Sequence, residues 1–154
     1  MADVFFTQAK RAIADQSAAD AINLVGTTVK VMLVDATYAP DPDDAFVDDG
    51  TANDPASHEI STTGYVGGFA GSGRKSLASK TLTADLVNNR AEFDAADLSW
   101  TTLATGPTIG GAVLIKERTA DTDSQVVGFF DLVNTPTNGG DISITWSVEG
   151  LLNF

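Results

Sequence analysis

The chain has 154 residues, contains no cysteine, and carries 21 acidic against 9 basic side chains, which gives a formal net charge of −12 at pH 7. This charge repels phosphate backbones and anionic lipid headgroups, so nucleic acid and membrane surfaces are poor candidate partners. The lack of cysteine excludes disulfide-stapled folds and thiolate zinc sites. A chain of this length buries roughly 70% of its unfolded surface on folding, and one substantial core is expected.

The start of the chain does not have the pattern of an export signal. It lacks a basic region followed by a long apolar run. No apolar stretch approaches the roughly 20 residues that cross a bilayer. The sequence therefore predicts a protein that remains soluble in the cytoplasm of the cell that makes it.

The first predicted element is an N-terminal helix over residues 3–19. This segment is rich in Ala and also contains Gln, Lys and Arg. Phe6, Ala9 and Ile13 follow one another at three- and four-residue spacings, with Ile22 beyond a gap, and such spacing forms an apolar stripe along one face of a helix. No second helical segment follows.

The remaining residues, 28–154, predict a body of β-strands. The first strand, 28–34, is short and β-branched, and it lies between Gly26 and a turn-rich segment. Residues 142–148 alternate between apolar and other side chains, which predicts that one face of that strand is buried. Further strand-like segments, separated by turn residues, are 81–87, 90–93, 98–101, 112–116 and 126–132.

Short strands after a single helix are typical of an antiparallel β-sandwich or small barrel, because a β-α-β sheet would need more helices for its crossovers. We therefore predict one mainly β domain over residues 1–154, with one N-terminal α-helix. Two long irregular stretches, 36–58 and 64–76, interrupt it. Connections in compact domains are mostly short, so these stretches are the expected carriers of function or of partner contacts.

Six carboxylates lie within residues 41–55, a density that suggests a calcium loop. An EF-hand loop needs an oxygen ligand at its fifth position and Gly at its sixth. Counted from Asp41, these positions hold Ala45 and Phe46, so the motif fails. We predict a solvated loop without a metal. The alternative is an irregular cation site, whose ligands would be Asp43, Asp44, Asp48 and Asp49.

The glycine-rich segment 67–76 comes close to a phosphate-binding P-loop. In that motif Lys directly follows the second Gly, so that it can reach the phosphates. Here Arg74 stands between Gly73 and Lys75, and the residues that follow alternate like a strand instead of opening a helix. A flexible hinge or a subunit contact is the prediction, in preference to a nucleotide site.

The sequence contains no recognisable catalytic motif, and we predict neither enzymatic activity nor a cofactor. His58 is the only histidine, and no Gly-x-Ser-x-Gly elbow is present. A surface histidine is the prediction for His58, with a catalytic base as the alternative. Trp100 and Trp146 lie on apolar strand faces and are predicted to be core residues. A glycosidase would need an aromatic cleft around a carboxylate pair, for which the candidates are Glu59, Glu92, Asp94 and Asp97.

Several segments along nearly the whole chain occur in a recognisable order. They are the strand 28–34 after a short helix, the acidic loop after Tyr38-Ala39-Pro40, and then 58–65, 74–81, 91–100, 138–147 and the tail 149–154. In this order and spacing they resemble a family of small virion proteins of tailed bacteriophages. The resemblance implies a non-enzymatic component of the particle, and it carries over no catalytic residue.

From this resemblance we predict a capsid decoration (cement) protein that binds the major capsid protein on the virion surface. Such a protein stabilises the head shell by burying surface across neighbouring capsomers. A homo-oligomer is expected, in the form of a trimer at threefold positions. The alternatives are a neck or tail component, or a carbohydrate- or cation-binding adhesion module that uses the acidic loop with Tyr38, Phe46 and Tyr65. The predicted contact residues are Phe5, Phe6, Ile13, Gly67, Gly68, Phe69 and Arg74, and a core role is the alternative for Phe5 and Phe6.

Overall fold

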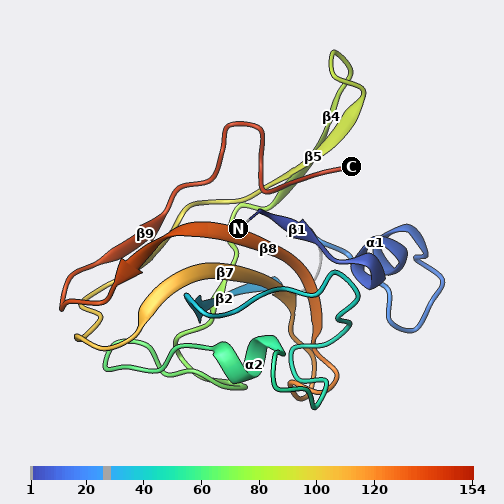
Figure 1. The fold of residues 1–154 in the computed structure, drawn as a ribbon. Coiled ribbons are helices and arrows are strands. Elements are labelled where there is room, and N and C mark those ends of the chain that lie inside the picture. Colours follow the sequence, from blue (N-terminus) through green and yellow to red (C-terminus); the bar gives the residue numbers. More distant parts are fainter. Residues whose placement is uncertain (1, 26–28) are drawn as a thin grey trace.

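The structure is a computed structural model that describes residues 2–25 and 29–154. Its described strands form three antiparallel sheets, and the largest has five strands in the order β1-β8-β7-β2-β3 (Figure 1). The prediction of a mainly β fold with one N-terminal helix is confirmed. The strands of the large sheet, in this spatial order, are β1 (Val4–Phe5), β8 (Gln125–Pro136), β7 (Thr108–Lys116), β2 (Val29–Asp35) and β3 (Lys75–Ser76).

The core is built around the three central strands of the large sheet. Because other segments cover both faces of these strands, they contain long apolar runs instead of an alternating pattern. Most of β2 and β7 and the first half of β8 are buried. The predicted strand 28–34 corresponds to β2, although Gly26 and Thr28 lie outside the described residues.

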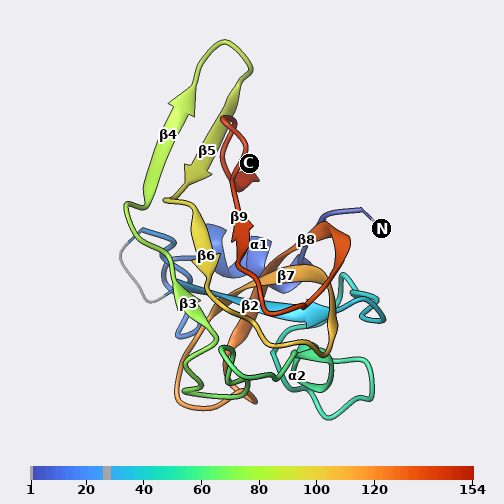
Figure 2. The same cartoon turned by 90° about the vertical axis from the view of Figure 1, so that its left-hand side faces the viewer.

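The two smaller sheets lie against this layer. One pairs β6 (Leu98–Trp100) with β9 (Ile142–Ile144), and the other has the order β10-β5-β4, formed by β10 (Leu152–Asn153), β5 (Arg90–Asp94) and β4 (Thr81–Asp85). The β4–β5 hairpin projects well beyond the rest of the molecule in both views (Figures 1 and 2). We call residues 81–91 the arm.

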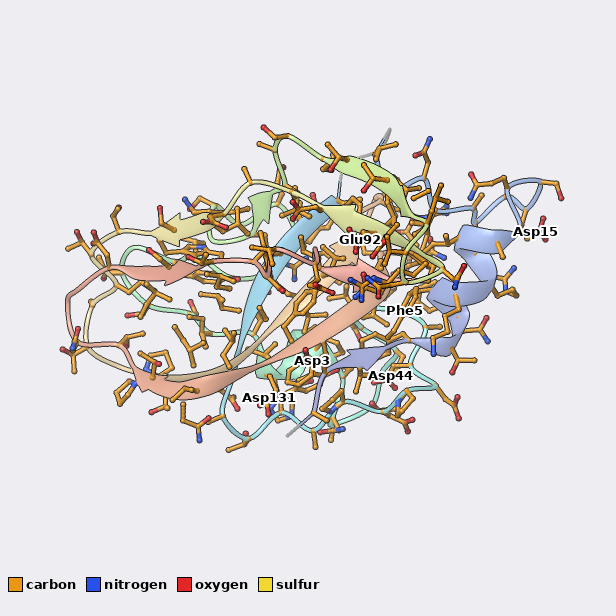
Figure 3. All side chains as sticks on the ribbon, turned by 90° about the horizontal axis from the view of Figure 1, so that it is seen from above. Asp3, Phe5, Asp15, Asp44, Glu92 and Asp131 are labelled. Carbon is orange, nitrogen blue, oxygen red and sulfur yellow. The ribbon has the colours of Figure 1, made fainter. Side chains whose placement is uncertain are left out.

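The N-terminal helix α1 (Thr7–Ala14) is shorter than the predicted 3–19. Before it, Val4 and Phe5 pair with β8 opposite Phe129 and Gly128, so the chain enters the helix from a strand. After it, Asp15 leaves helical geometry and its carboxylate accepts the N–H of Ser17 at 3.1 Å. Seen from above, Phe5 lies before the first turn and Asp15 after the last (Figure 3).

The predicted strand 142–148 ends early, at Ile144. The N–H of Trp146 donates to Asp97 at 3.0 Å, and the chain then turns between Ser147 and Gly150 toward β10. Ile144 is buried, but Val148 is 97% exposed, so the expectation of one buried face along the whole segment is wrong beyond Trp146. A second short helix, α2 (Pro55–His58), lies in the irregular stretch 36–58, contrary to the prediction that no second helical segment follows the first. None of the helices in the described residues is long and apolar enough to span a membrane.

Candidate functional site

A buried ion-pair cluster underlies the glycine-rich segment. The Arg74 guanidinium has no exposed area. Its Nε and Nη2 donate to the two carboxylate oxygens of Glu59 at 2.9 and 2.7 Å. Its Nη1 and Nη2 donate to Asp121 at 2.5 and 3.0 Å. Two-point pairing of this kind fixes the orientation of the guanidinium as well as its position.

Tyr65 connects this cluster to the large sheet. Its hydroxyl donates to Glu59 at 2.9 Å and accepts the N–H of Leu33, in β2, at 2.9 Å. Burial, together with the charge of Glu59, raises the pKa of Tyr65. Burial by itself would lower the pKa of Arg74, but its hydrogen bonds to Glu59 and Asp121 outweigh burial and raise it. We call Glu59, Tyr65, Arg74 and Asp121 the Arg74 cluster.

Residues 66–72 form a closed loop on top of the Arg74 cluster, which we call the glycine loop. Three hydrogen bonds close it: Gly73 N–H to Val66 O at 2.9 Å, Gly71 N–H to Gly68 O at 2.9 Å, and Gly68 N–H to a Glu59 carboxylate oxygen at 2.7 Å. Gly68 has a φ of +84°, a value that favours glycine. The loop is therefore held in place, contrary to the flexible hinge that the composition suggested.

The glycine loop exposes two large apolar side chains, Val66 at 57% and Phe69 at 42%. Phe69, Gly67 and Gly68 belong to the predicted contact residues and lie together here. Val66 was not predicted, because an isolated valine next to glycines gives no sequence signal. Exposed apolar side chains on an anchored loop make this segment a candidate contact surface.

The geometry of this segment also argues against a phosphate-binding loop. The N–H groups of Gly68, Gly71 and Gly73 are all used within the protein. Lys75 lies in β3, and its Nζ is 5.8 Å from the centroid of the Trp100 ring. Trp100 itself is 1% exposed, as predicted for a core residue.

Two of the predicted contact residues are in the wrong place for that role. Phe6 is fully buried in the core, which agrees with the alternative role given to the phenylalanines, and Arg74 is buried between two carboxylates, so neither side chain is available to a partner. Phe5 is half-buried, and its ring meets that of Phe154 edge to face at 5.3 Å. Ile13 is half-buried on α1.

Ile13 lines an apolar groove between α1 and the arm. The groove has a volume of about 300 Å³, and we call it the arm groove. Leu82, which is 52% exposed, and the C-terminal Phe154, which is 42% exposed, form its other apolar walls. Sequence reasoning missed this groove, because it brings together residues from both ends and the middle of the chain. Its lining residues are Lys10, Ile13, Ala14, Leu82, Ala91 and Phe154.

His58 does not form a catalytic relay in this structure. Its Nδ1 faces both Thr37 Oγ1 at 3.3 Å and Asp35 Oδ1 at 3.4 Å. A relay needs the acid and the nucleophile on opposite ring nitrogens. The Thr37 hydroxyl also donates to Asp35 at 2.5 Å, so these contacts form a local turn network. His58 is half-buried, with a side chain that is 17% exposed, so the prediction of a surface histidine holds only in part. Its ring is tilted by 47° against that of Tyr38, with 5.5 Å between the centroids.

The acidic loop uses most of its carboxylates to hold its own turns. Asp41, Asp48 and Asp49 each accept the N–H two residues further along, and Asp54 caps α2 by accepting the N–H of Ser57 at 2.8 Å. Asp44 is different, because burial and the nearby charges of Asp49 and Asp41 raise its pKa to about 6. Within the described residues, no group of three or more acidic or histidine side chains is placed to hold a metal ion.

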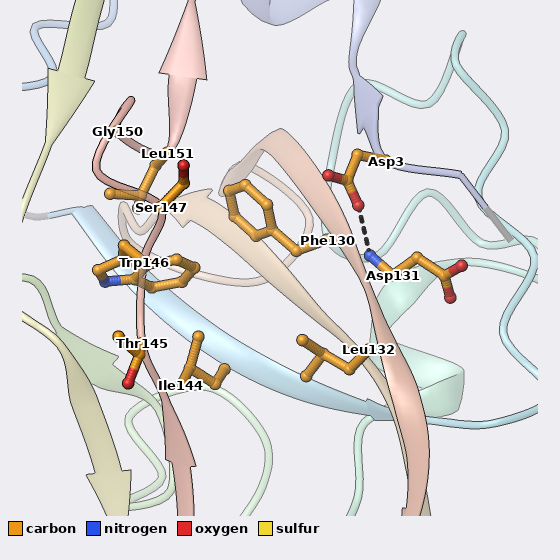
Figure 4. A pocket seen from close by; sticks show the side chains of 10 residues that line it. All are labelled: Asp3, Phe130, Asp131, Leu132, Ile144, Thr145, Trp146, Ser147, Gly150 and Leu151. Carbon is orange, nitrogen blue, oxygen red and sulfur yellow. Dashed lines mark hydrogen bonds between the residues drawn. The ribbon is translucent and has the colours of Figure 1, made fainter.

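Of the three aromatic residues considered for an adhesion module, two are not exposed. Tyr38 and Tyr65 are buried, whereas Phe46 is 37% exposed. Trp146 was predicted to be a core residue, but it is only half-buried. Its ring packs against that of Phe130, with 5.1 Å between the ring centroids. Both rings line a shallow pocket of about 200 Å³ (Figure 4).

Three of the four carboxylates considered for a glycosidase have separate roles. Glu59 belongs to the Arg74 cluster, Glu92 pairs with Arg90 on the arm, and Asp97 holds the backbone of Trp146. Asp94 lies at the end of β5.

No family model, no curated protein and no solved structure matches the chain.

Proposed function

We propose that this chain is a structural component of a tailed-phage particle, a decoration protein that binds the major capsid protein through the glycine loop. The observation that carries the proposal is that Val66 and Phe69 are exposed on a loop that the buried Arg74 cluster holds in place. A surface that is already ordered before binding loses little conformational freedom on contact. Binding free energy gained across neighbouring subunits then opposes opening of the shell.

Charge supports the same proposal. At a net charge of −12 the protein is repelled by packaged DNA and kept soluble before assembly. The order of segments along the chain, which resembles small phage virion proteins, is the third support.

The copy number of this chain in purified particles tests the assignment. A decoration protein is expected at a copy number comparable with that of the major capsid protein, measured by quantitative mass spectrometry. A neck or tail component would instead be present in about 6 to 12 copies, as ring symmetry requires. That result, or absence of the chain from the particle, would overturn the decoration proposal.

Binding of the purified protein to heads that lack it tests the contact surface. Val66→Asp and Phe69→Asp should each lower the bound fraction in co-sedimentation, because each places a charge in an apolar contact. Val148→Asp is the matched control, since Val148 is 97% exposed and distant in sequence from the glycine loop. Equal losses for all three variants, or none, would exclude the glycine loop as the binding surface.

A further inference from the structure

Strand β4 is an edge strand whose outward backbone groups can be identified. Ala91 exchanges two hydrogen bonds with Phe154, at 3.2 and 3.0 Å, so its N–H and C=O point toward the C-terminal strand. The next residue, Glu92, therefore points toward β4, where it stands opposite Thr83. Because backbone groups alternate along a strand, those of Leu82 and Ala84 point away from β5. No strand in the described part of the chain pairs with this side of β4.

The edge has few of the features that usually prevent strands from pairing with other molecules. Such features are a proline, a bulge or an inward-pointing charge in the strand. β4 contains no proline, and its one charged residue is the terminal Asp85, whose carboxylate accepts the N–H groups of the turn. The pairing of β4 with β5 continues without a register shift. All side chains from Thr81 to Ala84 are exposed. Within the part of the chain that the structure describes, the edge is thus open to pairing with another strand.

The arm also has an apolar face that continues past the body of the protein. Leu82 lies opposite Phe93 and Ala84 opposite Ala91, so these side chains share the face that is buried at the base of the arm. Beyond them, Leu86 and Val87 at the tip are 84% and 88% exposed. This face runs directly into the arm groove, which Leu82 lines.

The turn itself does not require these apolar side chains. Asp85 accepts the N–H groups of Val87 and Asn88 at 3.0 and 3.2 Å, and Asn89 adopts a φ of 54°. Asp and Asn are therefore sufficient to form the turn. Leu86 and Val87 are free to contact another molecule.

We propose that the arm is a self-association surface, on which β4 of one copy pairs antiparallel with β4 of a second copy about a two-fold axis at Ala84. In this register the outward groups of Ala84 in both copies bond to each other, and Leu82 of each copy faces Leu86 of the other. Asp85 faces Thr83. An axis at Asp85 would instead place two carboxylates directly opposite each other, which is unfavourable.

A second copy is the favoured occupant because the same arm carries both halves of the contact. Its apolar tip, Leu86 and Val87, lies beyond the end of β4, and its apolar groove begins at the start of β4, at Leu82. Antiparallel pairing reverses one arm, so the tip of each copy reaches the groove of the other. Such a self-complementary patch is what a two-fold interface requires. The inference goes beyond the proposed function, since it needs no capsid, and its two-fold contact differs from the threefold association expected from the sequence.

Complementary charges at Ala84 test the axis directly. Ala84→Lys and Ala84→Asp should each raise the dimer dissociation constant at least about tenfold, measured by analytical ultracentrifugation, because like charges then face each other across the axis. An equimolar mixture of the two variants should dimerise again. Ser99→Lys, an exposed change on β6, is the matched control and should leave the dimer intact.

A single cysteine gives an independent measurement, because the natural chain has none. Residues directly opposite in an antiparallel pair have Cα atoms about 5.5 Å apart, within the range of a disulfide. Ala84→Cys should therefore form a covalent dimer on mild oxidation, and Ser99→Cys should not. A wild-type monomer at high micromolar concentration, a trimer insensitive to the Ala84 variants, or failure of the mixture to reassociate would each overturn the proposal. Loss of shell binding by Val66→Asp with the dimer intact would leave it standing.

Discussion

Two strand edges in this protein are treated in opposite ways. Beyond β3, the edge of β2 is covered by the irregular segment: Leu33 donates its N–H to Tyr65 at 2.9 Å and accepts the N–H of Ile60 at 3.1 Å. The edge of β4 is left open, with apolar side chains beside it. We call the Arg74 cluster, the glycine loop and the adjoining end of β2 the base.

The difference shows where each part of the chain obtains its stability. The base buries its polar groups and must pair each of them, so its contacts are interdependent. The arm has few contacts with the rest of the molecule and is ordered mainly by the hydrogen bonds between β4 and β5 and by the Asp85 turn. Changes in the base should therefore affect folding, whereas changes in the arm should affect association.

The largest expected effect is that of Arg74→Ala. Removal of the Arg74 side chain leaves the buried Glu59 and the half-buried Asp121 carboxylates without their cation. Loss of one partner of a buried pair costs about 3–5 kcal/mol of unfolding free energy. Urea denaturation followed by circular dichroism measures this loss. Arg11→Ala is the control, because Arg11 pairs with Asp20 on the surface, and its midpoint should stay unchanged. A loss below about 1 kcal/mol for Arg74→Ala would contradict the role of the cluster.

A smaller effect is expected for Gly73→Ala. A Cβ at this position would overlap the Tyr65 ring, and overpacking of a core typically costs about 1–3 kcal/mol. At Gly106 the nearest atom to an added Cβ is 3.6 Å away, so Gly106→Ala should change the unfolding free energy little. Equal stability of the two variants would show that Tyr65 can move, and that the base is looser than its hydrogen bonds indicate.

Asp44, in the acidic loop, gives a pH-dependent contrast. Its pKa of about 6 lies above the ordinary value of 3.8, so the folded protein holds a proton that the unfolded chain has released. Stability contributed by this group is therefore present below pH 3.8 and lost as pH rises to about 6.

Asp44→Asn should remove that loss. Its melting temperature should exceed that of the wild type at pH 7, and the difference should shrink as pH falls through this window. Asp43→Asn is the matched control on an exposed neighbour. A constant difference between pH 4 and pH 7 would contradict the raised pKa. Addition of calcium to the wild type at pH 7 tests the alternative cation site, since binding would raise the melting temperature.

The smallest effect on folding is expected in the arm. Leu86→Ala removes a side chain that is 84% exposed and should change the unfolding free energy of the dilute protein by less than about 0.5 kcal/mol. The same substitution at fully buried Leu33 should cost about 2–5 kcal/mol. A large loss at Leu86 would mean that the arm folds back on the body in solution.

Much of the fold could be predicted from local patterns, because the strands carry β-branched runs and their turns carry Asn, Asp and Gly. Strand ends could not, since they depend on distant partners: β8 extends to Pro136 because β7 lies beside it, and residues after Ile144 leave their strand because Asp97 captures the backbone of Trp146. The helix was overestimated for the same reason, as Val4 and Phe5 are drawn into the sheet.

The site was harder to predict, because its residues are far apart in the sequence. Arg74 reads as a surface charge next to Lys75, and only the approach of Glu59 and Asp121, 15 and 47 residues away, turns it into a buried cation. Tyr65 reads as a loop aromatic, yet it covers the edge of β2. The exposed Leu86 and Val87 were placed inside a predicted strand, where their exposure could not be foreseen.

Both tryptophans of the protein belong to the body. Trp100 donates its indole N–H to Gly73 O at 2.6 Å, beside the Tyr65 ring, and Trp146 donates to Ala96 O at 3.1 Å next to Phe130. Residues 81–91 contain no aromatic side chain. Intrinsic fluorescence will therefore follow melting of the body while remaining blind to the hairpin, and a dye attached near residue 84 would be needed to observe it.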